Sequence, residues 1–358
     1  MGATVTRLRA SLRGQPFAPL RRDNVEALAT RALQRLRVTD LVKSVANRHQ
    51  PGPRPNVFLV TSPRSGSTWL MELIWSQPGF KCCDEPLNLR HPAVQRATGI
   101  ASWREMDSAA GATKLERYFR DICSGRQHSA DSLPFRGKYH RFRTDRIVFK
   151  LLHGAEGLIG ELAAKCNARV VILLRHPIAV SLSRESFPRL SAFRNGDAAA
   201  GFSAGQLRLA DRVIASGSHL EKGVLTWCFQ NAISLRGLQP DWTVVSYEQL
   251  VLDPEPVVAH LAERLELIDQ ALILSRLTEA AGNQGKSDAS TRQLLAEQAS
   301  GRLDKRRALV EKWRSQVTSA QESAAMALLP AFGLDAYRAG RLLPDQRYWI
   351  GDNQPALD

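Results

Sequence analysis

The sequence predicts an α/β protein in which a mainly parallel central sheet is flanked by helices, and two observations carry this prediction. Apolar residues fill all but one position of 57–61 and of 169–174, and such runs are typical of strands buried on both faces of a parallel sheet. Strand-like and helix-like patterns then alternate along the chain, as βα units require. The expected strands are 57–61, 146–151, 169–174 and 242–247. The helices expected after them are 67–76, 155–166, 178–186 and 254–266.

The first strand ends in a small, hydroxyl-rich loop that opens a helix, within the run from Val57 to Leu70. This loop offers successive backbone N–H groups, Ser and Thr hydroxyls, and one guanidinium at the positive end of a helix dipole, which together suit a multiply anionic ligand. It is not a Walker A motif, in which Lys follows the second Gly. Here a single cation, Arg64, precedes a single Gly66. The run therefore predicts a phosphate-binding loop of another kind.

The order Pro-Arg-Ser-Gly-Ser-Thr-Trp-Leu at 63–70 resembles the 5′-phosphosulfate loop of sulfotransferases that use 3′-phosphoadenosine 5′-phosphosulfate (PAPS), in its Arg rather than Lys form. The resemblance implies a P-loop-like fold and nucleotide contacts from Arg64, Ser65, Gly66, Ser67, Thr68 and Trp69. Thr68 and the loop amides would hold the 5′-phosphate, and Trp69 would offer a flat face to the adenine or else belong to the core. Because a guanidinium does not give up its proton, the part of Arg64 in catalysis would be electrostatic.

Two residues are candidates for the base that takes the proton of the acceptor. Glu85, followed by Pro86, comes after the first helix, as the catalytic Glu does in carbohydrate and tyrosyl-protein sulfotransferases. His153 follows the strand 146–151 and resembles the Lys-x-His segment of the cytosolic sulfotransferases, but with one extra residue. Imidazole needs little tuning to act as a base near neutrality. We favour Glu85, because the extra residue weakens the match at His153, and we expect Lys150 to touch the transferring sulfuryl group.

The strand 169–174 delivers Arg175 at its carboxyl end, followed by a proline that suits the first turn of a helix. Ser183, eight residues on, is expected about two turns along that helix, where it could share an anion with Arg175. In sulfotransferases the Arg and Ser of this pattern hold the 3′-phosphate of the nucleotide.

Two later segments, at 245–261 and 306–318, extend the resemblance over about 55–340, and the second of them looks like the terminal Trp-Arg segment of the family. Tyr247 ends the strand 242–247 and is followed by Glu, Leu and Asp-Pro; the matching Tyr in the family lines the adenine. The 3′-phosphate loop of the cytosolic branch has no clear counterpart, and Lys305 and Arg306 are among the substitutes that the sequence offers.

The formal net charge of +14 predicts attraction to polyanions, but it does not distinguish a nucleotide from a nucleic acid, an anionic membrane or an acidic glycan. Ten basic and three acidic residues lie within 1–50. Apolar residues at helical spacing over 24–47 predict a basic amphipathic helix, either packed on the core or lying on an anionic membrane surface. Residues 1–22 contain five arginines and no acidic residue, a composition that also resembles an organelle-targeting presequence.

We expect three parts: a basic N-terminal helical extension with its linker (1–55), a sulfotransferase domain (56–340) and a C-terminal tail (341–358). Five scattered cysteines without metal spacing predict a reducing compartment and no structural metal. The expected location is therefore the cytoplasm, with peripheral membrane contact through residues 24–47.

The function expected from the resemblance is sulfuryl transfer from PAPS to a hydroxyl or amine, giving adenosine 3′,5′-bisphosphate as the second product and requiring no metal. The Glu85-Pro86 context favours a glycan or glycolipid acceptor, while small phenolic, steroid or amine acceptors stay open. One alternative is a phosphotransferase without a Walker A loop, which would need Mg²⁺ and an acidic ligand at a strand end; we expect none at the principal strand ends. Another is a basic nucleic-acid-binding module, for which no recognition element stands out.

Overall fold

The computed structural model describes residues 42–43, 45–128, 138–152, 154–277, 303–352 and 354–355, with only the backbone given for 303–305. The basic segment 24–47 expected to touch a membrane lies almost entirely outside these residues. Asn47–Asp358 form one compact unit and Met1–Ala46 another, and the description below concerns the first. Within the described part of the chain, no helix is long and apolar enough to cross a membrane.

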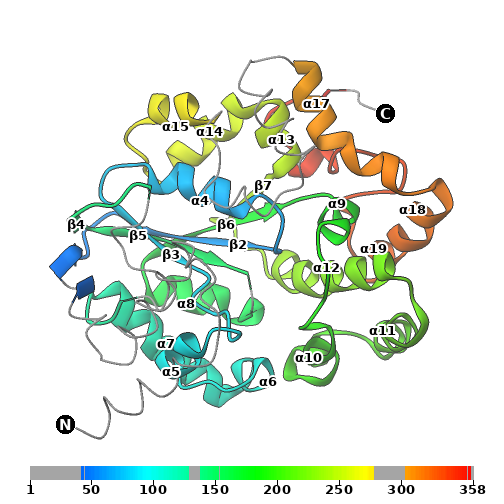
Figure 1. Cartoon of the computed structure of the whole chain (residues 1–358), viewed down its shortest axis with the longest axis horizontal. Helices are drawn as coiled ribbons and strands as arrows, with labels where there is room; N and C mark the ends of the chain where they lie inside the picture. The colour runs from blue at the N-terminus through cyan, green and yellow to red at the C-terminus, as the bar shows by residue number, and fades with distance from the viewer. Residues whose placement is uncertain are drawn as a thin grey trace, which may run out of the picture. The chain divides into compact units, whose positions relative to one another are not determined.

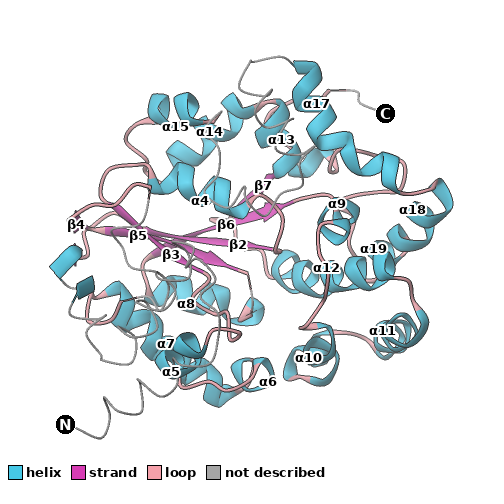
Figure 2. Ribbon diagram, viewed as in Figure 1, coloured by secondary structure: helices cyan, strands magenta, loops and turns pink. Residues whose placement is uncertain are grey.

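The predicted fold class is confirmed, because the unit is built on a five-stranded sheet whose pairings are all parallel (Figure 2). The strands, in the spatial order β3-β5-β2-β6-β7, are Phe80–Asp84, Arg146–Leu151, Asn56–Thr61, Ala168–Leu174 and Thr243–Ser246. A separate parallel pair joins β1 (Arg48–His49) to β4 (Arg143–Thr144). All residues of the central strand β2 are buried, as expected for a strand covered on both faces.

The helices fill the connections between the strands. From β2 to β6 they are α4 (Ser67–Trp75), α5 (Pro92–Thr98), α6 (Trp103–Met106), α7 (Ala109–Cys123), η2 (Glu156–Leu158) and α8 (Ile159–Lys165). From β6 to β7 they are α9 (Pro177–Leu182), α10 (Leu190–Asn195), η3 (Asp197–Gly201), α11 (Ala204–Ser216) and α12 (His219–Arg236). After β7 come α13 (Tyr247–Leu252), α14 (Pro254–Arg264), α15 (Gln270–Arg276), α17 (Leu303–Glu311), η5 (Lys312–Gln316), α18 (Ser319–Met326), α19 (Leu328–Ala331) and η6 (Gln346–Tyr348).

The helices cover both faces of the sheet. Figure 1 shows α4, α13, α14 and α15 on one face and α7 and α8 on the other. Phe119 of α7 packs its ring against Phe58 of β2 and Phe149 of β5, at centroid distances of 5.4 Å each. The sheet is therefore the middle layer of a core that continues into both helical layers.

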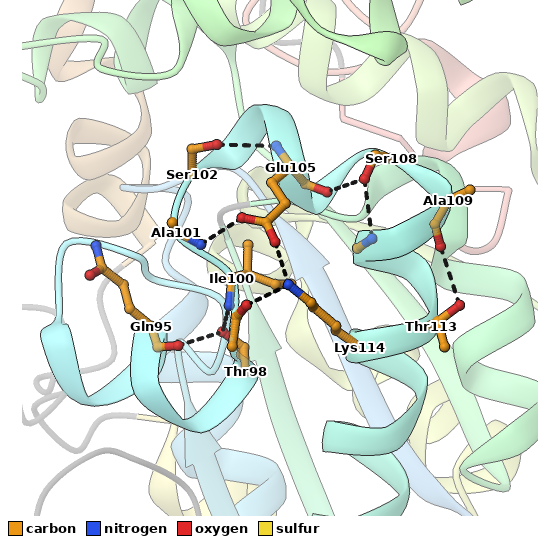
Figure 3. Close-up of polar contacts among 12 residues, drawn as sticks. Gln95, Thr98, Ile100, Ala101, Ser102, Glu105, Ser108, Ala109, Thr113 and Lys114 are labelled. Atoms are coloured by element: carbon orange, nitrogen blue, oxygen red, sulfur yellow. Dashed lines mark hydrogen bonds and ion pairs between the residues drawn. The ribbon is translucent and has the colours of Figure 1, made fainter.

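The segment 95–128, for which the sequence predicted no helix or strand, contains part of this core. Its helix α7 packs on the sheet face opposite α4 and begins with a capped turn, since the Ser108 hydroxyl accepts a hydrogen bond from the Gly111 amide at 3.1 Å. Lys114 then donates to the Gly99 carbonyl at 2.7 Å and pairs with Glu105 at 2.5 Å (Figure 3). These contacts hold α5, α6 and α7 together as a crossover between β3 and β5.

Two of the elements that the sequence patterns did not predict are central to the fold and the site. The edge strand β3 contains the cysteine pair Cys82 and Cys83 and was not expected to be a strand. The 18-residue helix α12 is buried over most of its length, including Trp227 and Phe229, and packs against α9. Its apolar residues lie all around the helix, so it shows little amphipathic pattern.

The segment expected to be a C-terminal tail packs onto this unit. Leu342 is fully buried, and the side-chain amide of Gln249 in α13 exchanges two hydrogen bonds with the backbone of Ile350, at 2.7 and 2.8 Å.

Candidate active site

The loop after β2 turns sharply into α4. Arg64 and Gly66 both adopt left-handed backbone conformations, with φ of 74° and 85°. Gly66 is the N-cap residue of α4, provides no side-chain cap, and is followed by no acidic residue in the first turn. The first N–H groups of a helix have no intrahelical acceptors, so this uncapped end presents donors and positive dipole charge to an anion.

Ser65 lies inside this loop and is fully buried. Among the described residues its hydroxyl has no hydrogen-bond partner. A buried hydroxyl without a partner costs free energy, so such groups in folded proteins call for an explanation. A bound phosphate oxygen at the start of α4 would give this hydroxyl an acceptor, which fits the anion expected from the sequence.

The ring of Tyr247, at the start of α13, lies directly against the loop. A Cβ atom at position 66 would come within 2.6 Å of the Tyr247 ring. The guanidinium of Arg175 stacks on the same ring at 4.2 Å and donates a hydrogen bond to the Arg64 carbonyl at 2.8 Å. Trp69 meets the ring edge to face, at 6.2 Å between centroids. The ends of β2, β6 and β7 therefore place Arg175, Tyr247 and the loop in one cluster, at the edge of the sheet where ligands of open α/β folds bind.

If the loop binds adenosine 3′,5′-bisphosphate, as the resemblance implies, Gly66→Ala should weaken that binding by about tenfold or more. Alanine would be strained at a φ of 85°, and its methyl group would displace the Tyr247 ring and with it Arg175. Isothermal titration calorimetry measures the effect. Gly351→Ala is the matched control, because Gly351 has a φ of 88° but nothing within 4 Å of the added Cβ. Equal affinities for the Gly66→Ala and Gly351→Ala proteins would contradict this account of the loop.

A second cluster surrounds the ammonium of Lys150, a buried residue near the end of β5 whose side chain is 3% exposed. Its Nζ donates to the Thr68 hydroxyl on α4 at 3.0 Å. It also forms ion pairs with Asp84 Oδ1 at 2.5 Å and with Glu85 Oε1 at 3.4 Å. We call residues 62–66, the loop between β2 and α4, the anion loop. The Lys150 cluster therefore connects α4, the helix that follows this loop, to two carboxylates at the end of β3.

Glu85, the favoured base, follows β3 in a strained backbone conformation with a φ of 49°. Its amide donates to the Lys150 carbonyl at 3.2 Å, and its Oε2 accepts a hydrogen bond from Asn88 Nδ2 at 2.8 Å. Left-handed conformations of residues other than Gly are uncommon and cluster at functional sites, where surrounding contacts hold them. The backbone at Glu85 thus turns its carboxylate from the strand end toward Lys150.

The carboxyl end of β3 corrects one expectation. No principal strand end was expected to carry an acid, yet β3 ends in Asp84 and Glu85 follows directly. The expectation was wrong because β3 itself was not predicted. The Asp84 carboxylate pairs with Lys150.

A buried network behind Arg175 fixes the strand ends. The carboxylate of Glu248 accepts hydrogen bonds from the His176 amide at 2.9 Å and from the Tyr337 hydroxyl at 2.7 Å. Burial raises the pKa of Glu248 and lowers the pKa of His176 to about 3, so the imidazole is neutral at physiological pH. The His176 ring stacks on Trp313 at 4.2 Å. This network holds β6 beside β7, so that Arg175 and Tyr247 meet.

Of the remaining predicted site residues, the structure describes Ser183 and the side chain of Arg306. Helix α9 ends at Leu182, so Ser183 caps its C-terminal end, and its hydroxyl donates to the Val180 carbonyl at 2.9 Å. The expected helix 178–186 is therefore too long. Arg306 lies on α17, which packs against α13. The side chain of Lys305 and all of His153 lie outside the described residues.

The comparisons with known proteins give one family. The model of the sulfotransferase domain matches residues 54–328. The sulfotransferase domain of the Synechococcus PCC 7002 olefin synthase is 21% identical, with a TM-score of 0.42 and coverage of 81% of this chain and 98% of that one. The sulfotransferase domain from the curacin biosynthetic pathway is 16% identical, with a TM-score of 0.42 and coverages of 78% and 98%. For the sulfotransferase STF9 from Mycobacterium avium these values are 13%, 0.34, 87% and 82%. Comparison with curated proteins gives no significant match.

Proposed function

The chain belongs to the sulfotransferase domain family, and on that premise we propose that it transfers the sulfuryl group of PAPS to a hydroxyl or amine of an acceptor. One observation carries the proposal. The Thr68 hydroxyl belongs to α4, the helix that follows the anion loop, and accepts a hydrogen bond from Lys150, which in turn pairs with Glu85. A hydroxyl that would hold the phosphosulfate and a carboxylate that would take a proton therefore both contact one buried ammonium.

The reaction is an in-line displacement at sulfur. A bond forms between the acceptor oxygen or nitrogen and sulfur, the bond from sulfur to the bridging oxygen breaks, and adenosine 3′,5′-bisphosphate leaves with that electron pair. The loop amides and the hydroxyls of Ser65 and Thr68 would hold the 5′-phosphate. Arg64 and Lys150 would stabilise the negative charge that develops on the leaving and equatorial oxygens. Glu85 would accept the acceptor's proton as the new bond forms.

The nucleotide would extend from the loop toward Arg175. The Arg175 guanidinium and the Ser183 hydroxyl would hold the 3′-phosphate, because Arg provides a planar set of donors that matches phosphate oxygens. Ser183 would exchange its bond to the Val180 carbonyl for this contact. Tyr247 and Trp69 would face the adenine.

For the acceptor we propose a hydroxyl of a glycan or glycolipid. Support comes from the sequence Glu85-Pro86 after the first helix, which resembles the context of the catalytic Glu in carbohydrate sulfotransferases. A screen with radiolabelled PAPS against glycans, glycolipids, phenols, steroids and amines tests this choice, and transfer to a phenol or steroid alone would overturn it.

Nucleotide binding tests the function itself. Adenosine 3′,5′-bisphosphate at about 100 times its Kd should stabilise the protein by about 2.7 kcal/mol in a thermal or denaturant unfolding experiment. ADP, which lacks the 3′-phosphate, should stabilise it much less at the same concentration. Equal stabilisation by ADP, or stabilisation only when Mg²⁺ is added, would favour a phosphotransferase instead.

A further inference from the structure

Asp84 and Lys150 occupy facing positions in the sheet. They are register partners across β3 and β5, so their side chains leave the sheet on the same face. Lys150 reaches Thr68 of α4 on that face, and Asp84 is the last residue of its strand. The pairing of β3 with β5 therefore directs one carboxylate toward the base of the anion loop.

The distances rank the neighbours of the Lys150 ammonium. Asp84 Oδ1 lies at 2.5 Å, the Thr68 hydroxyl at 3.0 Å and Glu85 Oε1 at 3.4 Å. An ammonium has three N–H donors, and a buried one needs both acceptors and a counter-charge. Asp84 is closer than Glu85, so it supplies the nearest negative charge.

We propose that Asp84 is a positioning residue that acts through Lys150; this inference deepens the proposed function and rests on it. Asp84 holds the ammonium beneath the start of α4, where the sulfuryl group would lie. Because Asp84 lies closer to Lys150 than Glu85 does, it also weakens the attraction between the ammonium and Glu85 Oε1, the oxygen that would take the acceptor's proton, while Asn88 holds Oε2 at 2.8 Å. Asp84 and Lys150 exchange no proton during transfer, and only Glu85 gains one.

Removal of the Asp84 charge should change the contacts of the Lys150 ammonium with both Thr68 and Glu85. In Asp84→Asn the side chain keeps its shape, but Glu85 becomes the nearest carboxylate to Lys150. The ammonium is then expected to move from Thr68 toward Glu85, away from the sulfuryl position. Glu85 Oε1 would then accept a closer hydrogen bond from Lys150. It would therefore be a poorer base for the proton of the substrate that receives the sulfuryl group.

The test is a double-mutant cycle on turnover of PAPS and the acceptor found in the screen. Asp84→Asn should lower kcat roughly 10- to 100-fold, in line with the cost of about 10²-fold for a misplacement of about 1 Å. The KM for PAPS should change less than about threefold, since the loop amides still hold the 5′-phosphate. In the Lys150→Met background, Asp84→Asn should lower kcat less than about threefold, because coupled residues give non-additive effects.

Asp211→Asn is the matched control. Asp211 lies on α11, pairs with Arg194 at 2.6 Å and has a side chain 50% exposed, against 40% for Asp84. Its loss should leave kcat unchanged. The melting temperature of each variant, with and without adenosine 3′,5′-bisphosphate, checks that the protein is folded and binds nucleotide. If Asp84→Asn does not fold, Asp84→Glu carries the same cycle, with a smaller loss of kcat expected because the charge is kept.

The outcomes separate the two levels of the argument. If the original protein neither transfers sulfuryl from PAPS nor is stabilised by adenosine 3′,5′-bisphosphate, the proposed function is wrong. If it does both, and Asp84→Asn retains full kcat, then Asp84 does not position Lys150. An equal loss of kcat in the original protein and in the Lys150→Met background would also overturn the inference, because Asp84 would then act independently of Lys150.

Discussion

Glu85→Gln is expected to lower kcat by roughly 10²–10⁴, the usual contribution of a positioned general base, while leaving PAPS affinity nearly unchanged. The amide keeps the shape of the side chain and its bond to Asn88, whereas its oxygen no longer takes a proton from the acceptor. Steady-state kinetics with a saturating acceptor, together with calorimetric titration of PAPS, separates the loss of chemistry from any loss of binding.

His153→Ala is the comparison that decides between the two candidate bases. If Glu85 is the base, the loss of His153 should cost far less than the loss of Glu85. If His153 is the base, the ranking inverts. In a plot of kcat against pH, the acidic limb should then lie near the ordinary imidazole pKa of about 6.5 rather than near a carboxylate pKa of about 4.3. Near-full turnover in both variants would remove both assignments.

The strands that carry the anion loop and Arg175 could be predicted because their own sequences are decisive. Residues 57–60 and 170–174 are continuous apolar runs, and the structure places them in the middle of the sheet as parts of β2 and β6. Such runs are favourable only where both faces are covered, so they indicate a parallel sheet without knowledge of the neighbours. The glycine and hydroxyl residues that follow then mark the loop.

The edge strand β3 could not be predicted in the same way. Its sequence Phe-Lys-Cys-Cys-Asp buries only Phe80 and Cys83 and follows neither the continuous nor the alternating strand pattern. Pairing with β5 makes it a strand, and this is a tertiary effect that overrides local preference. The contact between Asp84 and Lys150 depends on the register of that pairing, so it too was invisible in the sequence.

The two clusters of the site show the same division. Arg175 and Tyr247 follow recognisable strands, and the carboxyl ends of parallel strands meet at one edge of the sheet, so their proximity to the loop was predictable. The stacking of Arg175 on Tyr247 and its hydrogen bond to the Arg64 carbonyl were not, since they depend on side-chain packing. Likewise, the sequence predicted a helix over 178–186, whereas α9 ends at Leu182. The residues after Leu182 include no Gly or Pro before Pro188, so no local signal marked the end of the helix.

Arg175→Ala is expected to weaken PAPS binding by about 2–4 kcal/mol, the size typical for loss of a charge-assisted contact to a phosphate that stays bound. Adenosine 5′-phosphosulfate lacks the 3′-phosphate, so Arg175→Ala should weaken its binding only by loosening the anion loop. The loop loses the single hydrogen bond from Arg175 to the Arg64 carbonyl, for which about 1 kcal/mol is typical. Calorimetric titration of both nucleotides measures the difference, and Arg194→Ala, which removes a partly exposed arginine paired with Asp211, is the control. If Arg175→Ala weakens the two nucleotides equally, Arg175 holds the loop and not the 3′-phosphate.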